Sequence, residues 1–123
     1  MEKDELAVYY KHHGCNCAQS VLMAFQDQLP LEEAMIMKLG APFCAGMGGM
    51  EGTCGALIAA EMVLGFQKYK GKPILKDAGS LFEAFKHACN ATVCRELKGI
   101  GTGTVLCDCD TCIRNAVKAI EHK

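Results

Sequence analysis

The spacing of apolar residues along the chain predicts helices joined by short polar or glycine-containing turns. Apolar residues over 17–29 recur every three or four positions, which is the period of one helical face. The same spacing occurs over 6–11, 33–39, 75–89 and 110–120. No segment alternates apolar and polar residues with the period of two that is typical of a strand. We therefore predict an all-α fold, a compact bundle of about five or six helices.

The centre of the chain, residues 46–65, combines a glycine-rich half with an apolar half. Glycine is costly to fix in regular structure, so the first half predicts a loop. The second half predicts a buried helix with Thr53 as its N-cap, which places Cys54 in the first turn. The free amides and the dipole of that turn favour a thiolate. We expect Cys54 to be the reactive thiol, with the amides of Gly52 and Gly55 close to the sulfur.

The length and the net charge of the chain argue against several classes of protein. The 123 residues predict a single domain over 1–123, and half of them are hydrophobic. A net charge of −1 gives no basic surface for nucleic acid. No apolar run reaches the ~20 residues that span a bilayer, and the charged N-terminus lacks the apolar core of a secretory signal. We expect a cytoplasmic protein.

Nine cysteines are the strongest chemical signal in this composition. In a reducing compartment such a density indicates metal, cluster or redox chemistry more often than structural disulfides. Four of the cysteines each follow a predicted N-cap by one or two residues, and these caps are Asn16, Thr53, Thr92 and Asp110. The four cysteines are Cys17, Cys54, Cys94 and Cys112. If the four helix ends converge, they form a preorganised thiolate site.

These cysteines also carry a resemblance to a known family, the redox-active proteins named for the C_GCAxxG_C_C pattern. The run Asn16-Cys17-Ala18 resembles the first element, and the run from Cys54 to Ala59 resembles a Cys-Gly-Ala-x-x-Gly motif in which alanine replaces the closing glycine. Cys94 and Cys112 resemble the third and fourth elements. The resemblance extends roughly over 10–120 and implies redox activity, without naming a substrate.

Three interpretations of the four cysteines remain open. An iron–sulfur cluster needs four thiolates around one centre, and the four cysteines would be its ligands in a small electron-transfer protein. A metal-free thiol–disulfide oxidoreductase would need only two thiols, with Cys54 as the attacking one. A closed zinc site would use the same four sulfurs in a non-catalytic interaction module. We favour the iron–sulfur cluster and expect an electron donor or acceptor protein as the partner. The chain could also form homo-oligomers, and the sequence leaves this open.

The C-terminal run from Cys107 to Cys112 forms a second group of thiols, and its Cys109-x-x-Cys112 spacing suits a metal-chelating turn. Asp108 and Asp110 flank Cys109, and their like charge is expected to raise thiol pKa values there. We therefore expect the most reactive thiol to lie elsewhere. The roles of the remaining cysteines stay open; these are Cys15, Cys44, Cys89, Cys107 and Cys109.

Overall fold

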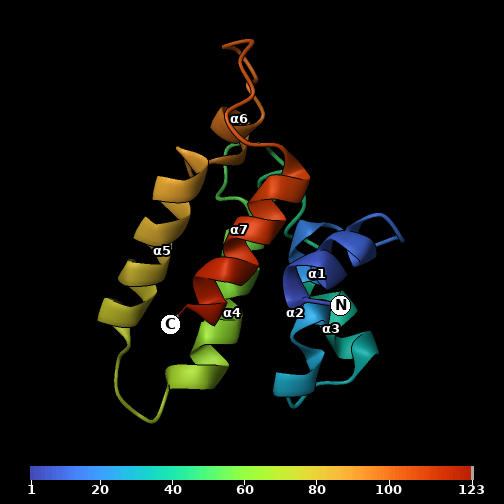
Figure 1. Ribbon diagram of the computed structural model, residues 1–123, viewed down its shortest axis with the longest axis vertical. Coiled ribbons are helices and arrows are strands. Elements are labelled where there is room, and N and C mark those ends of the chain that lie inside the picture. The colour runs from blue at the N-terminus through green and yellow to red at the C-terminus, as the bar shows by residue number, and fades with distance from the viewer. Residues whose placement is uncertain (123) are drawn as a thin grey trace.

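A computed structural model describes residues 1–122, and within them it shows seven α-helices, one short 3-10 helix and no strand (Figure 1). The predicted all-α bundle is confirmed. The count exceeds the expected five or six because the residues around Cys94 complete a helical turn of their own. The helices are α1 (Lys3–Lys11), α2 (Cys17–Ala24), η1 (Gln26–Gln28), α3 (Glu33–Gly40), α4 (Gly55–Lys68), α5 (Leu75–Cys89), α6 (Cys94–Leu97) and α7 (Cys109–Glu121).

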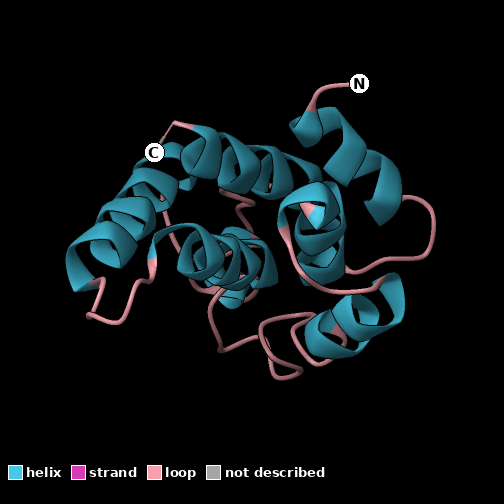
Figure 2. Cartoon of the chain, turned by 90° about the horizontal axis from the view of Figure 1, so that it is seen from below, coloured by secondary structure: helices cyan, strands magenta, loops and turns pink. Residues whose placement is uncertain are grey.

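Helix α7 is the element around which the others pack. It contacts α1, α2, α4 and α5, and the end-on view of Figure 2 shows the helices gathered side by side. One face of α7 is fully apolar and buried, because Ile113, Ala116, Val117 and Ile120 recur at helical spacing. Each large aliphatic side chain buried in this way contributes about 1.5–3 kcal/mol to the free energy of unfolding. Docking of α7 also brings its N-terminal turn against the starts of other helices.

The start of α2 carries the capping box that its sequence predicts. The Asn16 side chain accepts a hydrogen bond from the Gln19 amide at 2.8 Å, and the Gln19 side chain accepts one from the Asn16 amide at 2.9 Å. The Asn16 side-chain amide also donates to the carbonyl oxygens of Gly40 and Ala41. Asn16 therefore fixes the start of α2 and ties it to the end of α3.

Three other predicted N-caps are wrong. Helix α4 begins one residue later than expected, so that Cys54 is itself the N-cap, and α6 is preceded by Val93 rather than Thr92. Thr53 and Val93 pair in an isolated antiparallel bridge, which holds both residues extended and delays each helix. At α7 the cap is Asp108, whose carboxylate accepts from the Thr111 amide. That change moves the helix start to Cys109.

Replacement of Asn16 tests this account of the fold. We expect Asn16→Ala to lower the free energy of unfolding by about 1 kcal/mol or more, because the cap and two tertiary donors are lost together. Urea denaturation of reduced protein measures the change. Asn16→Asp keeps the capping acceptor and removes only the donors, so its loss should be smaller. Equal losses in the two variants would contradict the importance of the cap.

No helix in residues 1–122 combines the length and the apolar character that a membrane span requires. The longest, α5, has 15 residues and several charged side chains along its outer face.

Candidate metal and thiol site

A pocket of about 300 Å³ lies where α2, α4 and α6 begin. Five cysteines line it, together with two lysines, and none of its described lining residues is acidic. Sulfur is therefore the principal metal-binding atom available there. The cysteines are Cys17, Cys44, Cys54, Cys94 and Cys109, and the lysines are Lys11 and Lys98.

Backbone pairing holds Cys54 and Cys94 next to one another. The Cys54 amide donates to the Thr92 carbonyl at 2.8 Å, and the Cys94 amide donates to the Gly52 carbonyl at 3.0 Å. These bonds flank the Thr53–Val93 bridge, so the two segments run antiparallel just before α4 and α6. Two cysteines that are 40 residues apart in the sequence thus reach the same pocket.

Cys54 lies at the start of α4, where the surrounding groups stabilise its thiolate. A hydrogen bond from the Cys112 thiol, two from the Ala56 and Leu57 amides, and the charge of Lys98 together lower the pKa of Cys54 to about 7. Burial opposes this effect, and only 3% of the residue is exposed. The predicted influence of a helix N-terminus is present, although Cys54 is the N-cap.

The glycines beside Cys54 act through close packing. A side chain at Gly55 would collide with the carbonyl oxygen of Phe43, and one at Gly46 would lie 2.7 Å from the Cys94 Cβ. The Gly52 amide donates to the Gly46 carbonyl at 3.1 Å, so it is already used within the loop. The amides that reach the Cys54 sulfur come from the first turn of α4 instead.

Cys109 is the most acidic thiol of the pocket, contrary to the sequence expectation. A hydrogen bond from the Cys17 thiol, a second from Lys98 and the Lys98 charge lower the pKa of Cys109 to about 5. The same bond, together with burial, raises the pKa of Cys17. The neighbouring carboxylates do not outweigh these interactions: Asp108 caps α7, and Asp110 pairs with His12 at 2.8 Å.

Lys98 lines the pocket and also contacts the buried sulfur of Cys112. Its ammonium group donates to the Cys107 carbonyl at 3.3 Å, lies 3.9 Å from the Cys112 Sγ and bonds to Cys109. Burial favours the neutral amine, but the neighbouring thiolates outweigh it and raise the pKa of Lys98. A half-buried cation thus faces several thiolates at once. The sequence contains no local signal for this role, because Lys98 lies in the irregular segment after α6.

Behind the pocket, three further cysteines form a buried cluster: Cys89, Cys107 and Cys112, here called the inner triad. Their Sγ atoms lie within 4.8 Å of one another, and this spacing allows the three to hold a metal ion. The residues are 1%, 7% and 0% exposed, respectively. Interaction with Cys112 and a hydrogen bond from the Asn115 side chain at 3.3 Å lower the pKa of Cys89 to about 6. Burial raises the pKa of Cys107 to about 11.

The structure brings the four sequence-predicted cysteines into one neighbourhood centred on Cys54. Cys17 and Cys94 line the pocket with it and interact with its charge, whereas Cys112 lies behind it and donates a hydrogen bond to its sulfur. Cys109 lines the same pocket, although sequence reasoning gave it no settled role. The Asp108 cap, with Thr111 three residues later, is the pattern that places Cys109 at a helix start.

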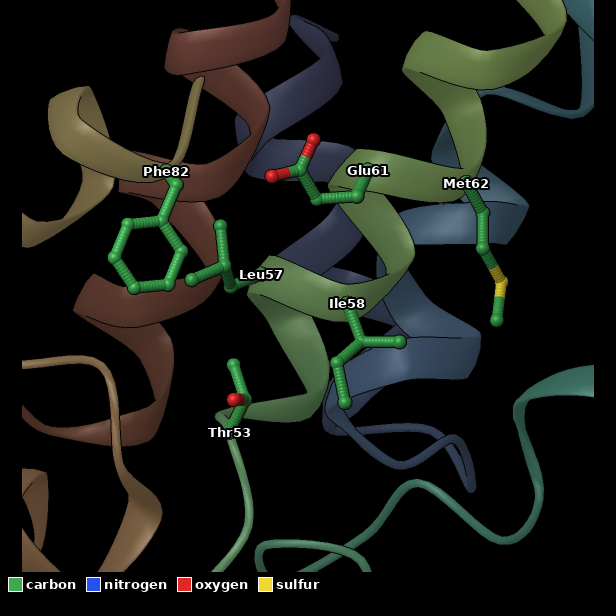
Figure 3. A pocket seen from close by; sticks show the side chains of 6 residues that line it. All are labelled: Thr53, Leu57, Ile58, Glu61, Met62 and Phe82. Carbon is green, nitrogen blue, oxygen red and sulfur yellow. The ribbon is translucent and has the colours of Figure 1, made fainter. Parts of the chain in front are cut away.

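A separate groove between α4 and α5 contains no thiol. Figure 3 shows Leu57 and Phe82 next to one another, with Ile58 and Met62 directed toward a different side of α4. Cys15 also lies outside the pocket, where its sulfur is 3.8 Å from the Met37 Sδ. Of the nine cysteines, five thus line the pocket and three form the inner triad.

Comparison with known proteins identifies one family model that matches residues 15–123, described as "Putative redox-active protein (C_GCAxxG_C_C)". This match includes every cysteine of the pocket and of the inner triad. No curated protein and no solved structure matches the chain.

Proposed function

Because this chain belongs to the C_GCAxxG_C_C family of redox-active proteins, we propose that its cysteine pocket carries a thiolate-bound iron–sulfur cluster or a closely related metal centre. The observation that supports this most is the convergence of several thiols from four helix starts on one pocket. When bound, such a centre supplies one-electron transfer. The chain over 1–123 then acts as a single electron-transfer domain.

The residues of the pocket fit such a group. Its donor atoms are sulfurs, the ligands preferred by iron–sulfur clusters and soft metals. The lowered pKa values of Cys109, about 5, and of Cys54, about 7, favour the ligating thiolate form of both near neutral pH, more so for Cys109. Lys11 and Lys98 supply positive charge that offsets the thiolates.

We propose Cys17, Cys54 and Cys94 as three ligands, with the fourth supplied by the first turn of α7. Cys112 is the fourth ligand predicted from the sequence, and it contacts Cys54 directly. Cys109 is the alternative, since it lines the pocket and accepts a hydrogen bond from Cys17. A cytoplasmic setting belongs to the proposal because a high density of cysteines in a reducing compartment is typical of metal or redox chemistry. The partner is an electron donor or acceptor protein.

Anaerobic purification tests the proposal. We expect the isolated protein to contain iron and acid-labile sulfide, with a broad visible absorption that weakens on chemical reduction. Metal analysis and absorption spectroscopy measure both properties on one sample. A colourless protein that contains only zinc would contradict the redox centre and support a structural zinc site instead.

A second candidate function is favoured by the bond between Cys17 and Cys109. In a thiol–disulfide oxidoreductase, the Cys109 thiolate attacks a substrate disulfide and releases one substrate thiol. Cys17 then displaces the second thiol, so that the substrate gains two electrons and the protein is left with a Cys17–Cys109 disulfide. A dithiol reductant would restore it. Metal-free protein that catalyses this cycle would favour this function over electron transfer by a cluster.

A further inference from the structure

We propose that the inner triad is a second metal site, separate from the pocket, which binds one copper(I) ion through Cys89, Cys107 and Cys112. Three thiol sulfurs from three different segments lie within 4.8 Å of one another. They come from the end of α5, from the loop before α7 and from α7 itself. Only a small inward movement of the sulfurs is needed to reach the bonding distances of a single ion.

The number of ligands selects copper(I) over zinc. Structural zinc sites are almost always four-coordinate, and among the described His, Cys, Asp and Glu residues no fourth ligand atom lies within the same 4.8 Å spacing. Water is a poor fourth ligand here, because the three cysteines are at most 7% exposed. Copper(I) is a soft ion that thiolates select, and three-coordination satisfies it.

The surroundings of the inner triad compensate the charge of the bound state. All three sulfurs bind as thiolates, so any thiol that is still protonated releases its proton to solvent, and the bound state of one copper(I) ion with three thiolates has a net charge of −2. The Lys98 ammonium group is 3.9 Å from the Cys112 Sγ and offsets one of these charges. The Asn115 side chain donates to the Cys89 sulfur at 3.3 Å, which leaves lone pairs of that sulfur for the metal.

This assignment has one consequence for the pocket. If the Cys112 sulfur binds copper, Cys109 becomes the α7 ligand of the proposed redox centre. Only this consequence rests on the proposed function. The copper site itself depends on the inner triad alone. Cys89 and Cys107 do not line the pocket, so replacing them separates the two sites.

Copper(I) titration of reduced protein as purified anaerobically, with its iron and sulfide retained, tests the proposal. A competing chelator such as bathocuproine disulfonate is present at a concentration that removes copper(I) from isolated thiols. We expect the wild-type chain to retain one copper(I) ion, with an X-ray absorption spectrum that contains only Cu–S scattering from three sulfurs. Cys89→Ser and Cys107→Ser should each lose that ion. Cys15→Ser, a control at a partly buried cysteine outside both sites, should retain it.

The two proposals can fail separately. Cys89→Ser and Cys107→Ser proteins that keep their iron and sulfide but lose copper(I) would support the inner triad and leave the pocket centre intact. Retention of copper(I) by both variants would overturn the inner triad as the site, and so would tight binding of zinc in preference to copper(I). Circular dichroism of each variant tests whether it is folded. The two substitutions lie in different segments. Unfolding of one therefore leaves the other as the test.

Discussion

Serine substitution of Cys17, Cys54 or Cys94 should abolish the redox centre, so that the purified variant contains neither iron nor acid-labile sulfide. A serine hydroxyl stays protonated near neutral pH and is a poor ligand for a soft metal, so each substitution removes one of four required ligands. The three cysteines lie at three different helix starts, and a loss at each of them would show that the centre bridges these helices. Iron and sulfide analysis of anaerobically purified protein measures the effect.

Cys15→Ser is the matched control, because Cys15 is separated from Cys17 by one residue yet lies outside the pocket. It should keep the full metal content. Comparison of Cys109→Ser with Cys112→Ser then identifies the ligand from α7, since only the true ligand should abolish the centre. If Cys15→Ser removes as much iron as the three pocket variants, the assignment of ligands to the pocket is incorrect.

In the metal-free reduced protein, Cys109 should be alkylated before Cys54. Its pKa is about 5 against about 7 for Cys54, and Cys109 is partly exposed whereas Cys54 is buried. Because the pKa of Cys109 is lowered, its reactive thiolate predominates above pH 5 and is lost as the pH falls through that value. Iodoacetamide labelling between pH 4 and pH 8, followed by peptide mass spectrometry, measures the rate at each cysteine.

Replacing Lys98 by Met tests the cause of this reactivity. The substitution removes the ammonium group that bonds to Cys109, so the midpoint of the labelling profile should rise by about one pH unit or more. Lys70→Met removes an exposed lysine from the turn between α4 and α5 and should leave the midpoint unchanged. An unchanged midpoint in Lys98→Met would show that the Cys17 hydrogen bond alone accounts for the acidity.

Most of the helices could be predicted because their apolar residues recur at the helical period. The bounds of α5 agree with the prediction at both ends, and the capping box at Asn16 is visible as residue types three positions apart. Such features depend on neighbours within one or two turns of the same helix. The sequence therefore contains nearly all of the information needed to recognise them.

The starts of α4 and α6 could not be predicted, because a long-range contact sets them. Thr53 and Thr92 have the residue type of an N-cap, but the pairing of Thr53 with Val93 keeps the preceding backbone extended. Nothing in either local sequence indicates that the two segments meet. A tertiary contact thus outweighs a local preference at both helices.

The sequence does not predict the lowered pKa of Cys109, for a related reason. The sequence shows two aspartates beside this thiol, and adjacent carboxylates would raise its pKa if they faced it. In the fold Asp110 pairs with His12 of the turn after α1, and Lys98 approaches the sulfur from the segment after α6. Charges that are distant in sequence and close in space decide the pKa of this thiol.

The position of α7 also determines when the site can assemble. Cys17 emerges from the ribosome about ninety residues before the cysteines of α7. Closing contacts over such long separations costs chain entropy and slows folding. The earlier thiols therefore remain without their α7 partners until the residues of α7 have been synthesised. Binding of a metal by the complete set of proposed ligands therefore requires that α7 has docked.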